Sequence, residues 1–134
     1  MTKEDKELLL KDLCARLPYG VILNVTLKDK YDEIVNRDIE LTEYNIGYIT
    51  KGSHWIEYKP YLRPMSSMTE EERKEYHKTF FYHERYDNEH KTGQNCSITF
   101  ETYDWLNKHH FDYRGLIKNG LALEAPEGMY NIKD

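Results

Sequence analysis

Six histidines give this sequence its widest choice of chemistry, because an imidazole can bind a metal ion or transfer a proton. The densest group is the stretch His109-His110-Phe111-Asp112, which holds two imidazoles and one carboxylate. His109, His110 and Asp112 are therefore the candidate metal ligands of a small metal-dependent hydrolase. The favoured interpretation is different: a histidine near a helix end caps the last carbonyl groups and interacts with the helix dipole. We accordingly expect no bound metal and no cofactor.

The sequence contains no recognisable catalytic motif. It lacks Gly-x-Ser-x-Gly, a glycine-rich phosphate-binding loop and His-Glu-x-x-His. Cys14 falls on the apolar stripe of a predicted helix, where a thiol acts as a small hydrophobic group. Cys96 precedes a predicted helix start, which would stabilise a thiolate, but no histidine lies beside it in the sequence. No catalytic residue is assigned, and an enzymatic function is the less favoured prediction.

The segment from Trp55 to Met65 concentrates aromatic residues, two cations, two prolines and a methionine. Tryptophan, tyrosine and arginine are the residue types that dominate binding energy at protein interfaces. The candidate protein-binding residues are therefore Trp55, Tyr58, Tyr61 and Arg63. Two alternatives remain open: the aromatic rings could fill the hydrophobic core, or they could stack on unpaired bases.

The charge balance argues against a nucleic-acid partner. The 134 residues include 19 Lys and Arg against 24 Asp and Glu, a net charge of -5, whereas phosphate binding depends on many cations that release counterions. No apolar run approaches the roughly 18 residues of a membrane span, and the charged beginning of the chain lacks the apolar region of a signal peptide. Two cysteines without a paired spacing are typical of a reducing compartment. We expect a cytoplasmic protein without membrane contact.

A helix is predicted over residues 1–17. Thr2 begins it, with Asp5 in the position that completes a capping box, and Pro18 ends it. Its leucines recur at helical spacing, while charged residues such as Asp12 fall mainly on the opposite face.

A small sheet is predicted over residues 20–58. The apolar pattern there changes to short alternating stretches bounded by turn residues, which indicates about four strands, one of them at 44–50. Short connections favour an antiparallel β-meander and leave open whether it closes into a barrel.

The remaining chain is predicted to be mainly helical. Thr69 and Glu72 form a capping box that begins a helix over 69–86. An exposed loop is expected to follow, then a helical C-terminal part and a tail; the ranges are 87–95, 99–123 (with helices at 101–109 and 113–118) and 126–134. Together these elements predict a single α+β domain, as a monomer or weak homodimer.

Three blocks of the sequence resemble short uncharacterised proteins encoded by gut-bacterial genomes and their phages or mobile elements. The blocks are Asp12–Val21, Tyr61–Thr69 and a C-terminal block made of residues 104–107, 109–117 and 120–122. The resemblance implies a small intracellular accessory protein of bacterial or phage origin. Because it carries no known activity, it transfers no functional residue.

The leading hypothesis is therefore a non-enzymatic protein that binds another protein through the segment that begins at Trp55. A metal-dependent hydrolase that uses the histidines and nearby acids is the first alternative. A binder of single-stranded nucleic acid is the second.

Overall fold

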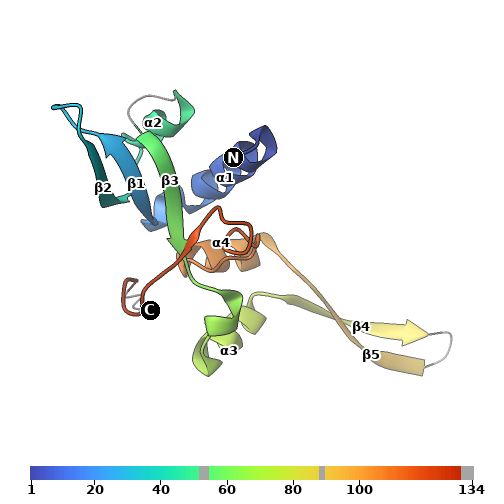
Figure 1. Ribbon diagram of the computed structural model, residues 1–134. Helices are drawn as coiled ribbons and strands as arrows, with labels where there is room; N and C mark the ends of the chain where they lie inside the picture. Colours follow the sequence, from blue (N-terminus) through green and yellow to red (C-terminus); the bar gives the residue numbers. More distant parts are fainter. Residues whose placement is uncertain (52–54, 88–89, 131–134) are drawn as a thin grey trace.

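The protein has an α+β fold, in which helices pack on a four-stranded sheet and a separate hairpin projects from the body (Figure 1). The computed structural model describes the backbone of residues 1–51, 55–87 and 90–130, and the side chains of residues 1–51, 55–81 and 97–130.

Helix α1 (Lys3–Arg16) begins where the sequence predicts. The Thr2 hydroxyl accepts from the Asp5 amide at 3.0 Å, and the Asp5 carboxylate accepts from the Thr2 amide at 3.2 Å, so the capping box is complete. After the short 3₁₀ turn η1 (Leu17–Tyr19), Gly20 adopts a φ of 70°. A Cβ at Gly20 would lie 2.9 Å from the Glu40 carboxylate, so glycine suits both the backbone angle and the space.

The sheet is open and mixed, with the strand order β2-β1-β3-β6. Its members are β1 (Ile22–Lys28), β2 (Ile34–Glu40), β3 (Trp55–Leu62) and β6 (Leu123–Glu124). The β1–β2 pair is antiparallel, as predicted. The sheet is not the predicted meander, however, because β3 pairs antiparallel with β1 and not with β2, and β3 and β6 are parallel. These four strands do not close into a barrel, because the edge strands β2 and β6 do not pair with each other. Strand β6 pairs only with the last residues of β3.

The strand predicted at 44–50 is wrong, because this segment forms helix α2 (Ile46–Thr50). Thr42 and Asn45 exchange two hydrogen bonds: the Thr42 amide donates to the Asn45 side chain at 2.8 Å, and the Asn45 amide donates to the Thr42 hydroxyl at 3.3 Å. This reciprocal turn bends the chain into a helix despite the alternating pattern. Residues 52–54, which comprise part of a predicted turn and the beginning of the next predicted strand at 53–58, lie outside the described residues.

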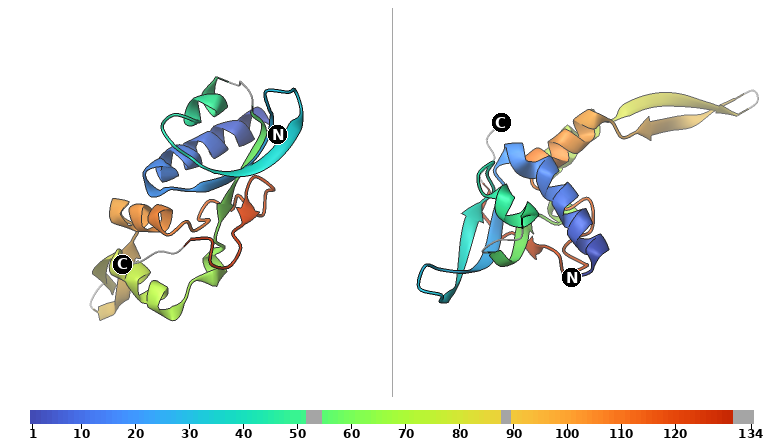
Figure 2. Two further views of the ribbon diagram at one scale, coloured as in Figure 1. Left: turned by 90° about the vertical axis from the view of Figure 1, so that its left-hand side faces the viewer. Right: turned by 90° about the horizontal axis from the view of Figure 1, so that it is seen from above.

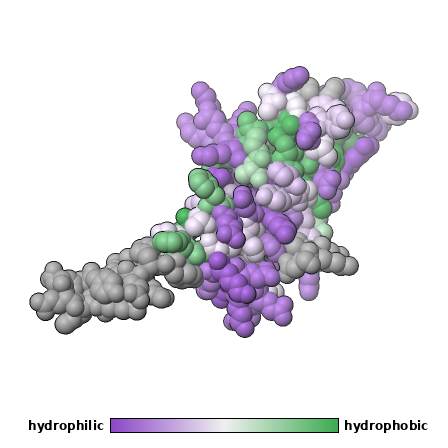
Figure 3. All heavy atoms as spheres, turned by 180° about the vertical axis from the view of Figure 1, so that it is seen from behind, coloured by the Kyte–Doolittle hydropathy of each residue, from purple (hydrophilic) through white to green (hydrophobic). Residues whose placement is uncertain are grey.

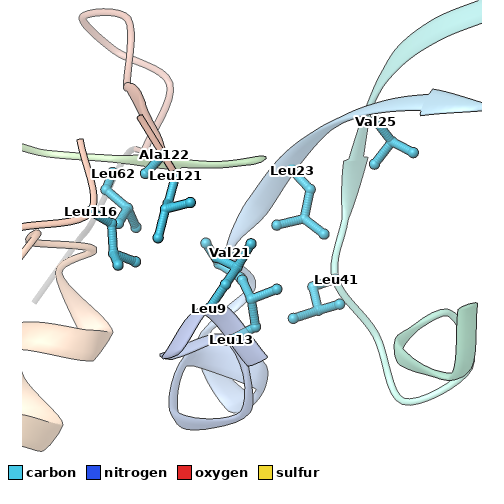
Figure 4. Close-up of a cluster of buried hydrophobic side chains, with 10 residues drawn as sticks. All are labelled: Leu9, Leu13, Val21, Leu23, Val25, Leu41, Leu62, Leu116, Leu121 and Ala122. Atoms are coloured by element: carbon cyan, nitrogen blue, oxygen red, sulfur yellow. The ribbon is translucent and has the colours of Figure 1, made fainter. Parts of the chain in front are cut away.

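The hydrophobic core lies between α1, one face of the sheet and the segment that precedes β6 (Figures 2 and 4). Leu9 and Leu13 extend from α1 toward Val21 and Leu23 at the beginning of the sheet. Burial of such side chains is worth about 1.5–3 kcal/mol each before the entropy cost of ordering them. Among the side chains that the structure describes, the buried residues of this cluster are Leu9, Leu13, Val21, Leu23, Val25, Leu41, Leu62, Leu116, Leu121 and Ala122.

The helix predicted over 69–86 is too long. A 3₁₀ turn η2 (Met65–Ser67) leads to helix α3 (Glu70–Lys78), which begins with the predicted Thr69 capping box. It ends at Thr79, whose hydroxyl donates to the Tyr76 carbonyl at 2.6 Å and is hydrogen-bonded to the Thr102 hydroxyl at 3.0 Å. Thr79 is therefore fixed against a later segment, and the chain leaves the helix there.

Two strands follow instead of the predicted helix end and exposed loop. Strand β4 (Phe81–Asp87) pairs antiparallel with β5 (His90–Ser97), and residues 88–89 between them are outside the description. The first residues of β4 are aromatic or charged, and aromatic side chains favour strands. The hairpin forms an arm that extends away from the sheet and the helices (Figures 1 and 2).

Helix α4 (Phe100–Lys108) matches the helix predicted at 101–109, with Thr99 as its cap. The helix predicted at 113–118 is wrong, because this segment forms turns. The Asp112 carboxylate accepts from the amides of Leu116 at 2.9 Å and Ile117 at 3.0 Å, and Gly115 adopts a left-handed φ of 72°. That angle interrupts a right-handed helix.

Candidate functional site

The four predicted protein-binding residues do not form one surface. Trp55 and Tyr58 pack against the edge of the core. The Tyr61 hydroxyl instead donates to the Asp38 carboxylate at 2.8 Å, among the polar side chains of β1 and β2. Because successive side chains of a strand point to opposite faces, Tyr58 and Tyr61 lie on opposite faces of β3. Trp55 lies on the side of Tyr58 because the register between β1 and β3 shifts by one residue between Glu57 and Trp55.

Arg63 has a structural role. Its guanidinium donates to both Glu72 carboxylate oxygens at 2.7 Å and to the His109 carbonyl at 3.2 Å. It also lies 4.2 Å from the centre of the Phe111 ring. Burial opposes ionisation of Glu72, but the bonds from Arg63 and Thr69 outweigh it and lower the pKa of the Glu72 carboxyl. Arg63 therefore joins β3, α3 and the segment after α4.

Trp55 and Tyr58 belong to an aromatic surface that also includes Met1, Tyr48 and Ile56, which we term the Trp55 surface. The Trp55 ring lies 5.5 Å from that of Tyr48 and 6.2 Å from that of Tyr58, centre to centre. Tyr48 is 40% exposed and Ile56 is 55% exposed, whereas Trp55 and Tyr58 are half-buried. Burial raises the pKa of the Tyr58 hydroxyl, so this ring stays neutral.

Two hollows flank Trp55, which lines both of them. The larger has a volume of about 500 Å³ and the smaller about 330 Å³. Lys6 lines the larger hollow and Lys28 lines the smaller one. Glu57 also lines the larger hollow, and its carboxylate lies 3.5 Å from the Lys59 ammonium group. The remaining lining is largely apolar or aromatic: Met1, Leu27, Ile39, Tyr48, Ile49, Ile56 and Tyr58.

The hydropathy of the surface differs between the two ends of the body. Figure 3 shows hydrophobic side chains gathered on the part that carries the sheet, bordered by hydrophilic ones, while the end that carries α3 is hydrophilic. Contiguous apolar surface is typical of sites that contact another molecule.

The candidate metal ligands are adjacent in sequence but do not converge. The His109 ring stacks on Trp105 at 4.2 Å, whereas the His110 ring stacks on Tyr130 at 3.7 Å. Both Asp112 oxygens accept backbone hydrogen bonds in the turn that follows. Among the side chains that the structure describes, no three His, Cys, Asp or Glu residues are grouped to hold a metal ion.

A buried charge network around Asp12 was missed by the sequence interpretation, which placed this residue on a solvated face. Arg16 donates to the Asp12 carboxylate from Nε at 2.7 Å and from Nη2 at 3.2 Å, and both side chains are fully buried. Arg16 also donates to the Phe111 carbonyl at 2.7 Å, and Arg114 donates to Asp12 at 3.1 Å. The sequence did contain a signal for this pair, because Asp12 and Arg16 are four residues apart and therefore lie on one face of the helix.

Comparisons with known proteins identify no relative: no family model, no curated protein and no solved structure matches this chain. The helices that the structure describes include none with both the length and the apolar character needed to cross a bilayer.

Proposed function

We propose that the protein acts by binding another protein through the Trp55 surface. The observation that carries the proposal is the position of Trp55 between two hollows, beside the exposed side chains of Tyr48 and Ile56. Half-buried aromatic residues next to hollows are typical of the anchoring sites at which a few residues provide most of the binding energy. Arg63, a member of the predicted binding set, is left out because it is bonded to Glu72.

The partner has an apolar side chain flanked by carboxylates. An apolar group fits the hollows beside Trp55, and the lysines at their margins, Lys6 and Lys28, attract acidic neighbours although the whole chain has a net charge of -5. The proposal includes the cellular context expected from the sequence, namely an accessory protein of bacterial or phage origin that acts in the cytoplasm.

Substitution of Ile56 by aspartate tests the proposal, because Ile56 is 55% exposed and lines the larger hollow. A matched control is Ile98→Asp, since Ile98 is 54% exposed and lies far along the chain between β5 and α4. Tagged wild-type protein and both variants are incubated with lysate of the source cell, and the bound proteins are quantified by mass spectrometry.

We expect at least one protein to be retained by the wild type and by Ile98→Asp, and to fall at least tenfold with Ile56→Asp, which corresponds to about 1.4 kcal/mol. Circular dichroism must show that both variants are folded. If Ile56→Asp and Ile98→Asp retain the same proteins in the same amounts, the Trp55 surface does not bind the partner.

A further inference from the structure

The last described residue, Tyr130, ties the C-terminal segment across the sheet. Its hydroxyl accepts from the Ile22 amide at 2.9 Å and donates to the Tyr61 carbonyl at 2.8 Å. At the other end of the segment, the Ala125 amide donates to the Leu62 carbonyl at 2.8 Å. Residues 124–130, which we term the strap, are thus attached at both ends.

The strap forms one side of the hollow that it covers. This hollow has a volume of about 530 Å³, and residues 124–128 and Tyr130 line it together with the segment that connects β3 to α3. The lining includes Arg63 and Ser67 of that segment and Glu72 of α3. Movement of the strap would therefore open the hollow, and Tyr130 is the residue that holds the strap's end.

Tyr130 rests on His110. The two rings stack at 3.7 Å between centres and 14° between planes. His110 is only 4% exposed, and its Nδ1 atom is buried without a hydrogen-bond partner among the described residues. His110 also has a left-handed φ of 63°, which is uncommon for a residue other than glycine. The ring is held in place by its neighbours and by Tyr130.

Cationic groups face His110 from several elements. Arg16 of α1, Arg63 just after β3 and the adjacent His109 all disfavour a positive charge on its ring. The carboxylates nearest to those arginines, Asp12 and Glu72, are already bonded to them. A proton on His110 would thus add a cation to a buried site that has no free carboxylate among these groups.

We propose that the stack of Tyr130 on His110 is an acid-sensitive latch, which holds the strap over the hollow and releases it when His110 is protonated. Protonation requires His110 to reach water, and the ring that covers it is Tyr130. The Tyr130 hydroxyl itself does not titrate in this range, because burial raises its pKa to about 12.

The size of the effect follows from the two protonation equilibria. Burial first, and then the charges of Arg16, Arg63 and His109, lower the pKa of His110 to about 4 in the closed state. With an ordinary pKa of about 6.5 in the open state, the open-to-closed ratio rises about 20-fold between pH 7 and pH 5.

The Ile22 amide reports on the latch, because it donates to the Tyr130 hydroxyl. Hydrogen exchange of this amide, measured by NMR and corrected for the intrinsic rate, is compared at pH 7 and pH 5. We expect its opening equilibrium to rise about 20-fold in the wild type. In His110→Phe, which keeps a ring for stacking but cannot be protonated, we expect a change below about twofold.

Equal pH responses in the wild type and His110→Phe would overturn the proposal. It would also fail if Ile22 exchanged at the same rate as the core amide of Val25 at both pH values, since the opening would then be global unfolding.

The pKa of His110 provides a test that does not depend on the folding of His110→Phe. Its titration by NMR in the wild type should give a pKa near 4, and Tyr130→Ala should raise that pKa toward 6.5, because water then reaches the ring. An unchanged pKa in Tyr130→Ala would show that Tyr130 does not control access to His110.

Discussion

Removal of the Asp12 carboxylate is predicted to destabilise the protein more than any change on the exposed side of α1. Asp12 is fully buried and is contacted by Arg16 and Arg114. In Asp12→Ala, the Arg16 guanidinium remains buried and loses its carboxylate partner, while it keeps its hydrogen bond to the Phe111 carbonyl. Leaving such a charge unpaired costs about 3–5 kcal/mol.

Replacement of the arginine is predicted to cost less. Arg16→Met removes the buried cation, fills much of its volume with an apolar side chain and leaves Asp12 paired with Arg114 at 3.1 Å. We expect a loss of about 2 kcal/mol, mainly from the hydrogen bonds that Asp12 and the Phe111 carbonyl no longer receive. The order of the two variants thus depends on which charge is left unpaired.

Urea unfolding followed by circular dichroism at pH 7 measures both free energies. The exposed Asp104 of α4 provides a control: Asp104→Ala should change the unfolding free energy by no more than about 0.5 kcal/mol. If Asp12→Ala destabilises the protein no more than Arg16→Met does, the buried network does not have the energetic role assigned to it.

Three further results are expected. Folding lowers the pKa of His110 from 6.5 to about 4, so the unfolded state binds more protons between these pH values. The contribution of neutral His110 to the unfolding free energy is therefore complete above pH 6.5 and falls by about 3 kcal/mol toward pH 4. The difference between wild type and His110→Phe in urea unfolding measures it. Arg63→Lys loses the two-pronged contact with Glu72 and should lower the unfolding free energy by about 1–2 kcal/mol, whereas Arg73→Lys, an exposed control on α3, should not. Protein purified without a histidine tag should contain less than about a tenth of an equivalent of zinc by elemental analysis, and a full equivalent would favour the hydrolase alternative.

The helix starts were predictable because their signals are local. In the capping boxes at Thr2 and Thr69, the two residues that exchange hydrogen bonds are three positions apart. The end of α3 was not predictable, since Thr79 is fixed by the hydroxyl of Thr102, 23 residues later. Helix α2 was missed because its segment has an alternating apolar pattern, which is typical of a strand. The two reciprocal hydrogen bonds between Thr42 and Asn45 form a turn before the helix instead.

The candidate site was predictable in part for a related reason. Residue type alone identified Trp55 and Tyr58, which lie at the core edge beside the two hollows. It could not show that Arg63 is bonded to Glu72, because an arginine of a binding site and one of an ion pair have the same sequence signature. Likewise, the sequence could not show that Arg16 is buried, because Arg16 donates to the Phe111 carbonyl, which lies 95 residues away along the chain.

Photo-crosslinking from position 56 tests the central claim most directly. A photoreactive phenylalanine analogue is placed at Ile56 in one variant and at Ile98 in another, which are 55% and 54% exposed. Both variants are irradiated in living source cells, and the adducts are separated by mass. A discrete adduct with another protein from position 56, absent from position 98, is the predicted result. Adducts from position 98 alone, or none from position 56, would contradict the account.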